Sequence, residues 1–360
     1  MKRVLRFFAV MLLLLAVFSV NAFADEGEDI IDDFSSIIPD GAEIDLDEVT
    51  AELGIEAIFS EITAALADRV GDAVAFFLLL LGFAVIISLT SHASLGIDGS
   101  LDSGVEAAVS AIAAASVFTA LYDLCAAVEH SLTTVVDFFA SAIPIFTVIS
   151  TSAGATATAS TQAFNMNLTL ALIEKFCTGA LLPASFAVFS LGFFASISDG
   201  GAGNVAKGVK SAFMWGVGLV GSVLAAVIAM QSVVASAADN AALRAARYAA
   251  SGMIPIVGST VASAISTLGG GMAYLKSTVG MGSVAVILIL SIAPLVSLLL
   301  YRLAISACLV YLEFSGSVGG VRCYSAFRSA LDTLIAVYST SVLVCIIELV
   351  VFVKGGITAG

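Results

Sequence analysis

Charged and basic side chains are scarce in this chain, and their scarcity excludes several classes of protein. Only 12% of the 360 residues are charged, 14 are Lys or Arg, and two are His. A nucleic-acid interface needs clustered cations to bind phosphates, so no nucleic-acid partner is expected. With two histidines and neither a His-Glu-x-x-His nor a Gly-x-Ser-x-Gly motif, the sequence contains no recognisable hydrolytic site.

Cysteine is also rare and irregularly spaced. The five cysteines are odd in number and never form a Cys-x-x-Cys pair, which argues against a disulfide framework or a zinc site. The nearest match to a phosphate loop, Gly203 to Ser211, has Val209 where a lysine must follow the second glycine. We therefore expect no catalytic residue, no cofactor and no metal.

Apolar residues, in contrast, are abundant. Hydrophobic residues make up 60% of the chain, more than a soluble fold can bury, so the composition predicts an integral membrane protein. The acidic residues are concentrated, because 16 of the 28 lie between Asp25 and Asp72. The expected fold class is all-α: a polytopic helical membrane protein with a signal peptide and a short acidic extracytoplasmic helical segment.

Residues 1–24 have the three parts of a secretory signal peptide. Basic residues are followed by an apolar run from Phe7 to Val20 and by Ala22-Phe23-Ala24, a small-x-small ending that suits a signal peptidase. The alternative is an uncleaved first anchor, for which the apolar run is short. Cleavage after Ala24 would leave the N-terminus of the mature chain outside the cytoplasm.

Residues 25–72 form the expected acidic extracytoplasmic segment. Its first part is acidic and contains Pro39, and it is expected to be loosely ordered until a partner or the next helix fixes it. From Asp45 onward, apolar residues recur at helical spacing, with most acids on other faces. This pattern predicts an amphipathic helix that leads up to the membrane.

Residues 73–360 are expected to form a helical membrane domain with several spans. The first uncharged run, 73–91, has 19 residues, nearly enough to cross a hydrocarbon core of about 30 Å. The expected spans lie near 73–91, 105–128, 135–150, 176–198, 213–238, 281–303 and 333–353. A hydroxyl-rich stretch after residue 150 predicts a polar break followed by a new helix, and Pro294 predicts a kink.

The stretch 239–280 is Gly-rich and only moderately apolar. Tyr248 to Leu275 contains no charge, so a re-entrant or interfacial hairpin is expected here rather than a free loop. Charges within apolar stretches, such as Asp137 and Arg302, are costly in lipid. Each predicts either a polar contact between helices or a side chain that reaches the membrane surface.

An ordered string of residues between about 237 and 304 resembles the stage III sporulation protein AE family of endospore-forming bacteria. It is listed here in chain order: Ala237-Ala238-Asp239, Arg244, Arg247, Ile254-Pro255-Ile256-Val257-Gly258, Thr267, Leu275-Lys276, Gly280, Pro294 and Tyr301-Arg302-Leu303-Ala304. Glu313 and Cys323 continue the resemblance more loosely. The chain departs from the family pattern at Asn240, where Gly is expected, and at Phe314, where Pro commonly follows the Glu.

The resemblance implies a function in sporulation. Members of this family are encoded with seven other stage III sporulation A proteins, and they are placed in the mother-cell membrane around the engulfed forespore. With a forespore membrane partner they form a transenvelope channel or feeding complex that supports late forespore gene expression. The resemblance therefore implies a structural or conduit subunit, with those proteins and the lipid bilayer as partners and homo-oligomers as an option. It offers no catalytic residues to transfer.

The assembly or gating candidates come from the matched string and its flank: Asp239, Arg244, Arg247, Pro255, Gly258, Lys276 and Arg302. The simpler interpretation is that they only end helices and shape a turn. One alternative function is a secondary permease with its own small-solute site, built on broken helices near Pro183 and Gly269 to Gly271. A less favoured alternative is an intramembrane hydrolase, for which no pairing of nucleophile and base is evident.

Overall fold

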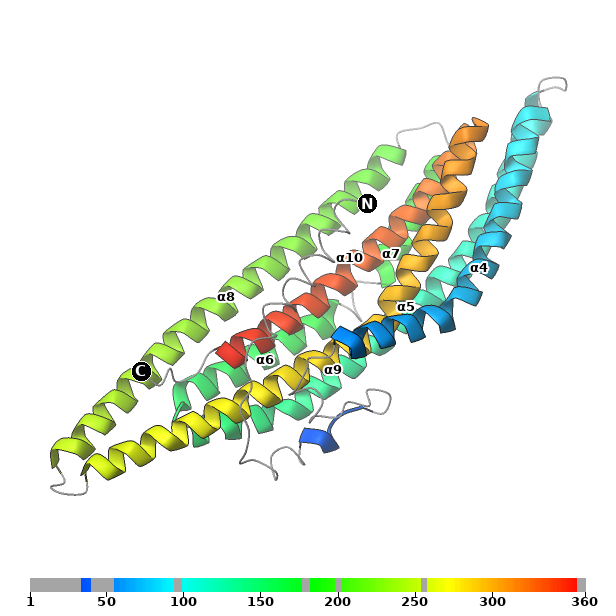
Figure 1. Ribbon diagram of the computed structural model, residues 1–360. Coiled ribbons are helices and arrows are strands. Elements are labelled where there is room, and N and C mark those ends of the chain that lie inside the picture. The colour runs from blue at the N-terminus through cyan, green and yellow to red at the C-terminus, as the bar shows by residue number, and fades with distance from the viewer. Residues whose placement is uncertain are drawn as a thin grey trace.

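Seven long α helices make up most of the part of the chain that the computed structural model describes (Figure 1). The described residues are 34–39, 55–93, 99–176, 182–197, 202–253 and 258–354. The helices are α4 (Ile55–Ala93), α5 (Gly99–Ser152), α6 (Thr156–Phe176), α7 (Leu182–Ile197), α8 (Ala202–Met253), α9 (Gly258–Ser315) and α10 (Val318–Lys354). No strand occurs within these ranges, and the all-α prediction is confirmed for them.

The long uncharged runs explain why the chain is helical. In lipid every backbone N–H and C=O must be paired within the chain, and a helix achieves this within one segment. Five helices are long and apolar enough to cross a membrane: Ser60–Thr90, Ser110–Ser152, Lys207–Ala245, Lys276–Ser315 and Val318–Val353. A shorter apolar helix covers Pro183–Phe194. By length and composition, these helices indicate a multi-pass membrane protein.

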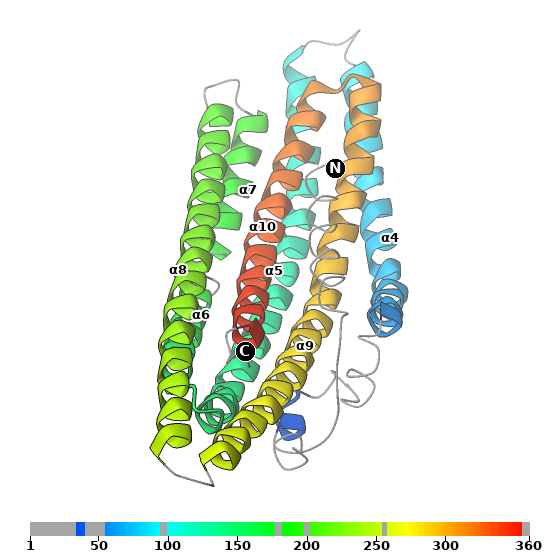
Figure 2. The ribbon, with the colours of Figure 1, turned by 60° about the vertical axis from the view of Figure 1, so that its left-hand side comes forward.

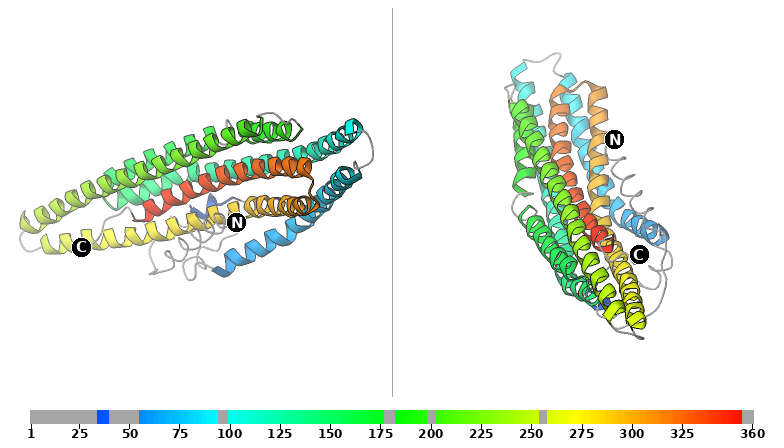
Figure 3. Two further views of the ribbon diagram at one scale, coloured as in Figure 1. Left: turned by 90° about the horizontal axis from the view of Figure 1, so that it is seen from above. Right: turned by 90° about the vertical axis from the view of Figure 1, so that its left-hand side faces the viewer.

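The helices run up and down one elongated bundle (Figure 2). Successive passages alternate in direction along the chain: α4, α5, the pair α6 and α7, α8, α9 and α10. Helix α9 has 58 residues, so at about 1.5 Å per residue it measures about 87 Å, far more than a hydrocarbon core. Both views in Figure 3 show the resulting length of the bundle. Parts of the longest helices must therefore extend beyond the hydrocarbon core.

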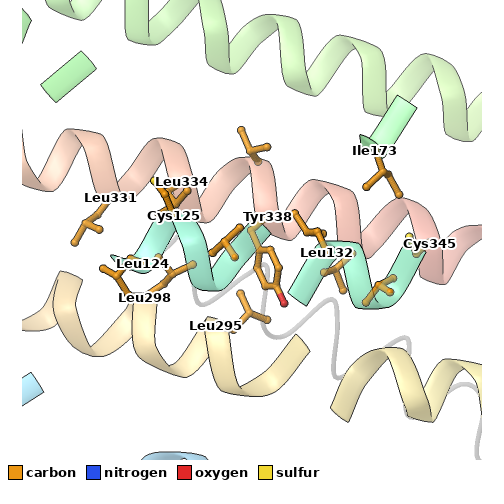
Figure 4. Packing of buried hydrophobic residues seen from close by; sticks show 14 of the residues in the cluster. Leu124, Cys125, Leu132, Ile173, Leu295, Leu298, Leu331, Leu334, Tyr338 and Cys345 are labelled. Carbon is orange, nitrogen blue, oxygen red and sulfur yellow. The ribbon is translucent and has the colours of Figure 1, made fainter. Parts of the chain in front are cut away.

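Helix α10 lies at the centre of the bundle. It contacts α7, α8 and α9 extensively, α5 and α6 more lightly, and α4 least. Its fully buried aromatic side chains include Tyr324, Phe327 and Tyr338. The close-up in Figure 4 shows Tyr338 among Leu and Cys side chains from α5, α9 and α10. The Tyr324 hydroxyl also donates to the backbone oxygen of Leu80 at 2.7 Å, which ties α10 to α4.

A polar contact compensates for the proline in α9. Pro294 has no N–H, so the Leu290 carbonyl four residues earlier lacks its usual helical donor. The Ser131 hydroxyl of α5 donates to that carbonyl at 3.1 Å, and its oxygen lies 2.9 Å from the Tyr338 hydroxyl. Figure 1 shows α9 changing direction between its yellow and orange parts, in the region of the kink expected at Pro294. A neighbouring helix thus supplies the donor that the proline removes.

One glycine of α8 allows close packing against α10. A Cβ placed on Gly221 would lie 2.8 Å from the Thr340 methyl group, closer than real Cβ atoms approach. Gly216 and Gly218, on the same helix, have no atom within 4 Å of such a Cβ. Of these three glycines of α8, only Gly221 therefore lies at a close contact between helices.

Two spans that the sequence predicts separately lie in one continuous helix. The spans near 105–128 and 135–150 both belong to α5, which continues through Pro144. The expected break after residue 150 is present, because α5 ends at Ser152 and α6 begins at Thr156. Gly154, between them, has a φ of 79°, a conformation that glycine adopts without strain. The membrane boundaries of all the spans remain predictions.

The expected hairpin over 239–280 consists mainly of helix. Residues up to 253 continue α8, and α9 runs unbroken from 258 onward, through Gly269 to Gly271. The broken helix expected at these glycines is therefore absent. Pro183 lies in the first turn of α7, where its missing N–H has no helical partner to lose. Entry of this hairpin into the membrane is a prediction from the sequence.

Part of the acidic segment contacts the bundle. Phe34 is fully buried, and its ring makes an edge contact with Phe138 of α5, the centroids 6.0 Å apart. Ile37 and Ile38 pack against the same core. Residues 34–39 thus pack against the helical bundle. The predicted signal peptide, 1–24, lies outside the described residues.

Candidate functional site

Asp239 caps the N-terminus of another helix. Ala155, the residue before α6, has no side-chain acceptor for the unpaired N–H groups of the first turn. The two carboxylate oxygens of Asp239 in α8 accept these hydrogen bonds from the backbone N–H groups of Ala157, at 2.9 Å, and Thr158, at 2.6 Å. A negative charge at a helix N-terminus is also favoured by the helix dipole. Since Asp239 is only 4% exposed, this contact fixes α6 to α8 inside the bundle.

Lys276 of α9 joins the same cluster. It is 5% exposed and lies close enough to Asp239 for an attractive electrostatic interaction. Its ammonium group also lies 4.7 Å from the ring centroid of Phe352 in α10, within the range of a cation–π contact. Asp239, the first turn of α6 and Lys276 are called the Asp239 junction below. It connects α6, α8, α9 and α10.

The other candidates in α8 and at the start of α9 follow Asp239 along the chain. Arg244 is exposed, about one turn further along α8, and Arg247 is in the same helix. Gly258 is the first residue of α9. Pro255 lies outside the described residues. The structure thus brings together Asp239 and Lys276, which are 37 positions apart in the chain.

Arg302 forms a second cluster of charges. Its Nε atom lies 2.6 Å from Oδ1 of Asp332 in α10, and the Lys210 ammonium of α8 lies 3.2 Å from Oδ2 of the same carboxylate. The three side chains are between 19% and 25% exposed. Of the two interpretations offered for Arg302, the contact between helices is therefore the observed one. These three residues, the Asp332 junction, connect α8, α9 and α10.

A buried polar stripe runs along α6. Thr158, Gln162, Asn165 and Thr169 follow one another at spacings of four, three and four residues, which places them on one face of the helix. None is more than 3% exposed. At the end of the stripe, the Thr169 hydroxyl donates to Oε2 of Glu348 in α10 at 3.3 Å. Glu348 itself is 1% exposed, so a carboxyl group lies in the interior of the bundle.

Sequence reasoning missed Asp332 and the α6 stripe. Asp332 is one isolated acid beside the last apolar run, and nothing in the sequence names its partners. Only Thr158 of the stripe lies in the hydroxyl-rich stretch expected to form the polar break, although the four-three-four spacing signals one helix face. No group of three or more His, Cys, Asp or Glu side chains that could hold a metal ion occurs in the described ranges.

Fold and polar contacts together define the class: an all-helical, multi-pass membrane protein whose interior charges join helices to one another. Residues 44–356 match the family model of stage III sporulation protein AE. Because this match covers most of the chain, the protein belongs to the stage III sporulation protein AE family, and the resemblance noted from the sequence is confirmed. Comparison with curated proteins and with solved structures gives no match.

Proposed function

We propose that this sporulation protein is a membrane subunit of the stage III sporulation A transenvelope complex between mother cell and forespore. Its role is structural or that of a conduit, it supports late forespore gene expression, and it involves no catalysis. Its place is the mother-cell membrane around the forespore, with the N-terminal segment outside the cytoplasm. Its partners are the other stage III sporulation A proteins and a forespore membrane protein. Family membership supports this proposal.

The observation that carries the structural role is the Asp332 junction. One carboxylate binds two cations from two other helices, Lys210 of α8 and Arg302 of α9. Charges placed within apolar helices usually mark either a transport path or a contact that holds helices together. Here both cations are paired, so the junction supports a fixed scaffold.

The assembly or gating element is proposed to be the end of the bundle that holds the Asp239 junction. Asp239 and Lys276 hold the helices there, and Arg244 is exposed on the same helix as Asp239. Arg247, Pro255 and Gly258 follow near the connection between α8 and α9. Arg302, at the other junction, contributes by fixing α9 to α10. The exposed Arg244 is the member best placed to meet a partner, because the buried members are occupied within the chain.

Complementation in an endospore-forming host that lacks its own family member tests this proposal. Arg244→Glu reverses an exposed charge, and charge reversal at an interface suppresses association. We expect a late forespore reporter and the recovery of partner proteins to fall by about tenfold, equivalent to about 1.4 kcal/mol, at an unchanged level of the variant protein. The matched control is Arg328→Glu, an exposed arginine of α10 outside the matched string. Normal sporulation and normal recovery of partners with Arg244→Glu would remove the assembly role.

The alternative is a secondary permease. The observation that favours it is Glu348, a carboxyl group buried between α6 and α10 beside uncharged polar groups. Such groups inside a membrane often mark a solute or ion path. The broken helix expected at Gly269 to Gly271, on which this alternative partly rested, is absent. Solute flux into vesicles that contain only this protein would favour the permease over the structural role.

A further inference from the structure

The buried stripe of α6 contains polar groups without partners. Both amide atoms of Asn165, the Nε2 atom of Gln162 and the Thr158 hydroxyl are buried with no hydrogen-bond partner among the described residues. Leaving such a group unpaired in the interior costs about 1–3 kcal/mol each, so buried polar atoms are nearly always satisfied. Gln162 has one partner, since its Oε1 atom accepts a bond from Ser150 at 3.4 Å. Of the remaining groups, the Asn165 oxygen is an acceptor that a cation can use, whereas the amide nitrogens of Asn165 and Gln162 are donors that need an acceptor such as water.

Glu348 supplies a negative charge next to these groups. Its Oε2 atom accepts a bond from Thr169, and Asn165 lies one turn earlier on the same face of α6. None of the ion pairs formed by the described residues includes Glu348. Burying an ionised carboxylate without a cation is very costly. A cation bound beside Glu348 would remove this cost.

The available ligands are oxygens with one negative charge in total. They are the Glu348 carboxylate, the Thr169 hydroxyl and the amide oxygen of Asn165. Divalent Ca²⁺ takes six to eight oxygen ligands, usually including several carboxylates, whereas one carboxylate balances a single positive charge. Soft or imidazole-preferring metals find no thiolate or imidazole in this set. The ligand set therefore matches a monovalent alkali cation.

A cavity lies one helical turn from these ligands. It has a volume of about 40 Å³ and lies between α6, α8 and α10, with Leu172 and Ile173 following Thr169 and Val344 preceding Glu348. Leu, Ile and Val side chains line most of it, and an apolar cavity of this kind stays dry, so it provides free volume beside the site but no polar path to it.

We propose that Glu348, Thr169 and Asn165 bind one monovalent alkali cation of about the size of sodium inside the bundle. Bound there, the ion joins α6 to α10 at a level where no other described charge pair connects them. The site is tested on the isolated protein, so the result of that test does not depend on the proposed role in sporulation. The chain would then need the cation for full stability whether it serves as a scaffold or as a permease.

Thermal unfolding of the full-length protein in detergent tests the site. The protein is measured in NaCl, LiCl or KCl and, at the same ionic strength, in choline chloride, whose cation is too large to enter. We expect a saturable rise in melting temperature of about 3–5 °C with NaCl over choline chloride. Glu348→Gln and Asn165→Leu remove the rise. Glu313→Gln, an exposed acid of α9, is the matched control and keeps it.

Direct binding of radioactive sodium to the wild-type protein is a second test, which can refute the proposal even if a variant fails to fold. One ion per chain, lost in Glu348→Gln, is expected. Equal melting temperatures in every salt, or a rise that persists in Glu348→Gln, would overturn the proposal. A response to acidification that depends on Glu348, with no response to any alkali cation, would assign the site to a proton and would also overturn it.

Discussion

Helices α8 and α10 are similarly apolar, yet they occupy opposite environments. In the most apolar stretch of α10, 61% of the residues are buried within the bundle, against 22% in α8. Trp215, Met230 and Val233 of α8 are each more than two-thirds exposed, whereas Phe327 and Tyr338 of α10 are fully buried. The comparison teaches that hydrophobicity selects helices for the membrane but does not decide which helices contact lipid and which are buried among other helices.

The largest effect is expected where α8 does enter the interior, at Asp239. Asp239→Ala removes two charge-assisted hydrogen bonds from the N-terminus of α6 and the acidic neighbour of Lys276. We expect the free energy of unfolding to fall by about 3 kcal/mol, because bonds to charged groups contribute about 1.5–3 kcal/mol each and are only partly replaced. Thermal unfolding in detergent measures this loss of stability. Asp137→Ala, at an exposed position of α5, should leave the stability nearly unchanged.

An equal loss of stability in the two variants would show that α8 is not fixed through Asp239.

The contact between α8 and α10 at Gly221 should show an intermediate effect. Gly221→Val places a branched side chain against Thr340, and overpacking costs about 1–3 kcal/mol. Gly218→Val, three positions earlier on α8, adds the same atoms to open space and should cost little. Paired melting curves of the two variants measure the difference. Two variants of equal stability would mean that α8 does not pack closely on α10 at Gly221.

A smaller effect is expected at the hydroxyl of Tyr338. Tyr338→Phe keeps the ring but removes the group that lies 2.9 Å from the Ser131 oxygen and donates to the Ser291 carbonyl at 3.4 Å. A loss of about 1 kcal/mol is expected, since one net hydrogen bond contributes roughly that amount. Tyr122→Phe, at a half-exposed tyrosine of α5, is the control and should cost nothing measurable. If the two tyrosine variants melt together, the polar contact at the Pro294 kink is not a stabilising one.

Much of the helical plan was predictable from local features. Uncharged runs locate helices because lipid allows no unpaired backbone, and the hydroxyl-rich stretch marks the break before Thr156 because such residues compete for backbone bonds. Arg302 was also recognisable, since a charge in an apolar run requires a partner or an exit. The lengths of α8 and α9 could not be predicted, because the moderately apolar, Gly-rich stretch between 239 and 280 carries little helical signal.

Contacts between distant helices could not be predicted from the sequence. Gly216, Gly218 and Gly221 look alike in a one-dimensional pattern, and only the position of Thr340 distinguishes the last of them. The same holds for Asp239, whose partner is the first turn of a helix more than 80 residues earlier. Each of these contacts depends on which helix becomes the neighbour, a property of the whole bundle.

Disulfide cross-linking in native membranes tests most directly the central claim, that α10 is the buried centre against which α8 packs at Gly221. Gly221→Cys is combined with Thr340→Cys, and the membranes are oxidised; Gly218→Cys with Thr340→Cys is the matched pair. The packing of α8 on α10 predicts an efficient intramolecular cross-link for the first pair and little for the second. Equal cross-linking of the two pairs, or a stronger link in the second, would contradict it.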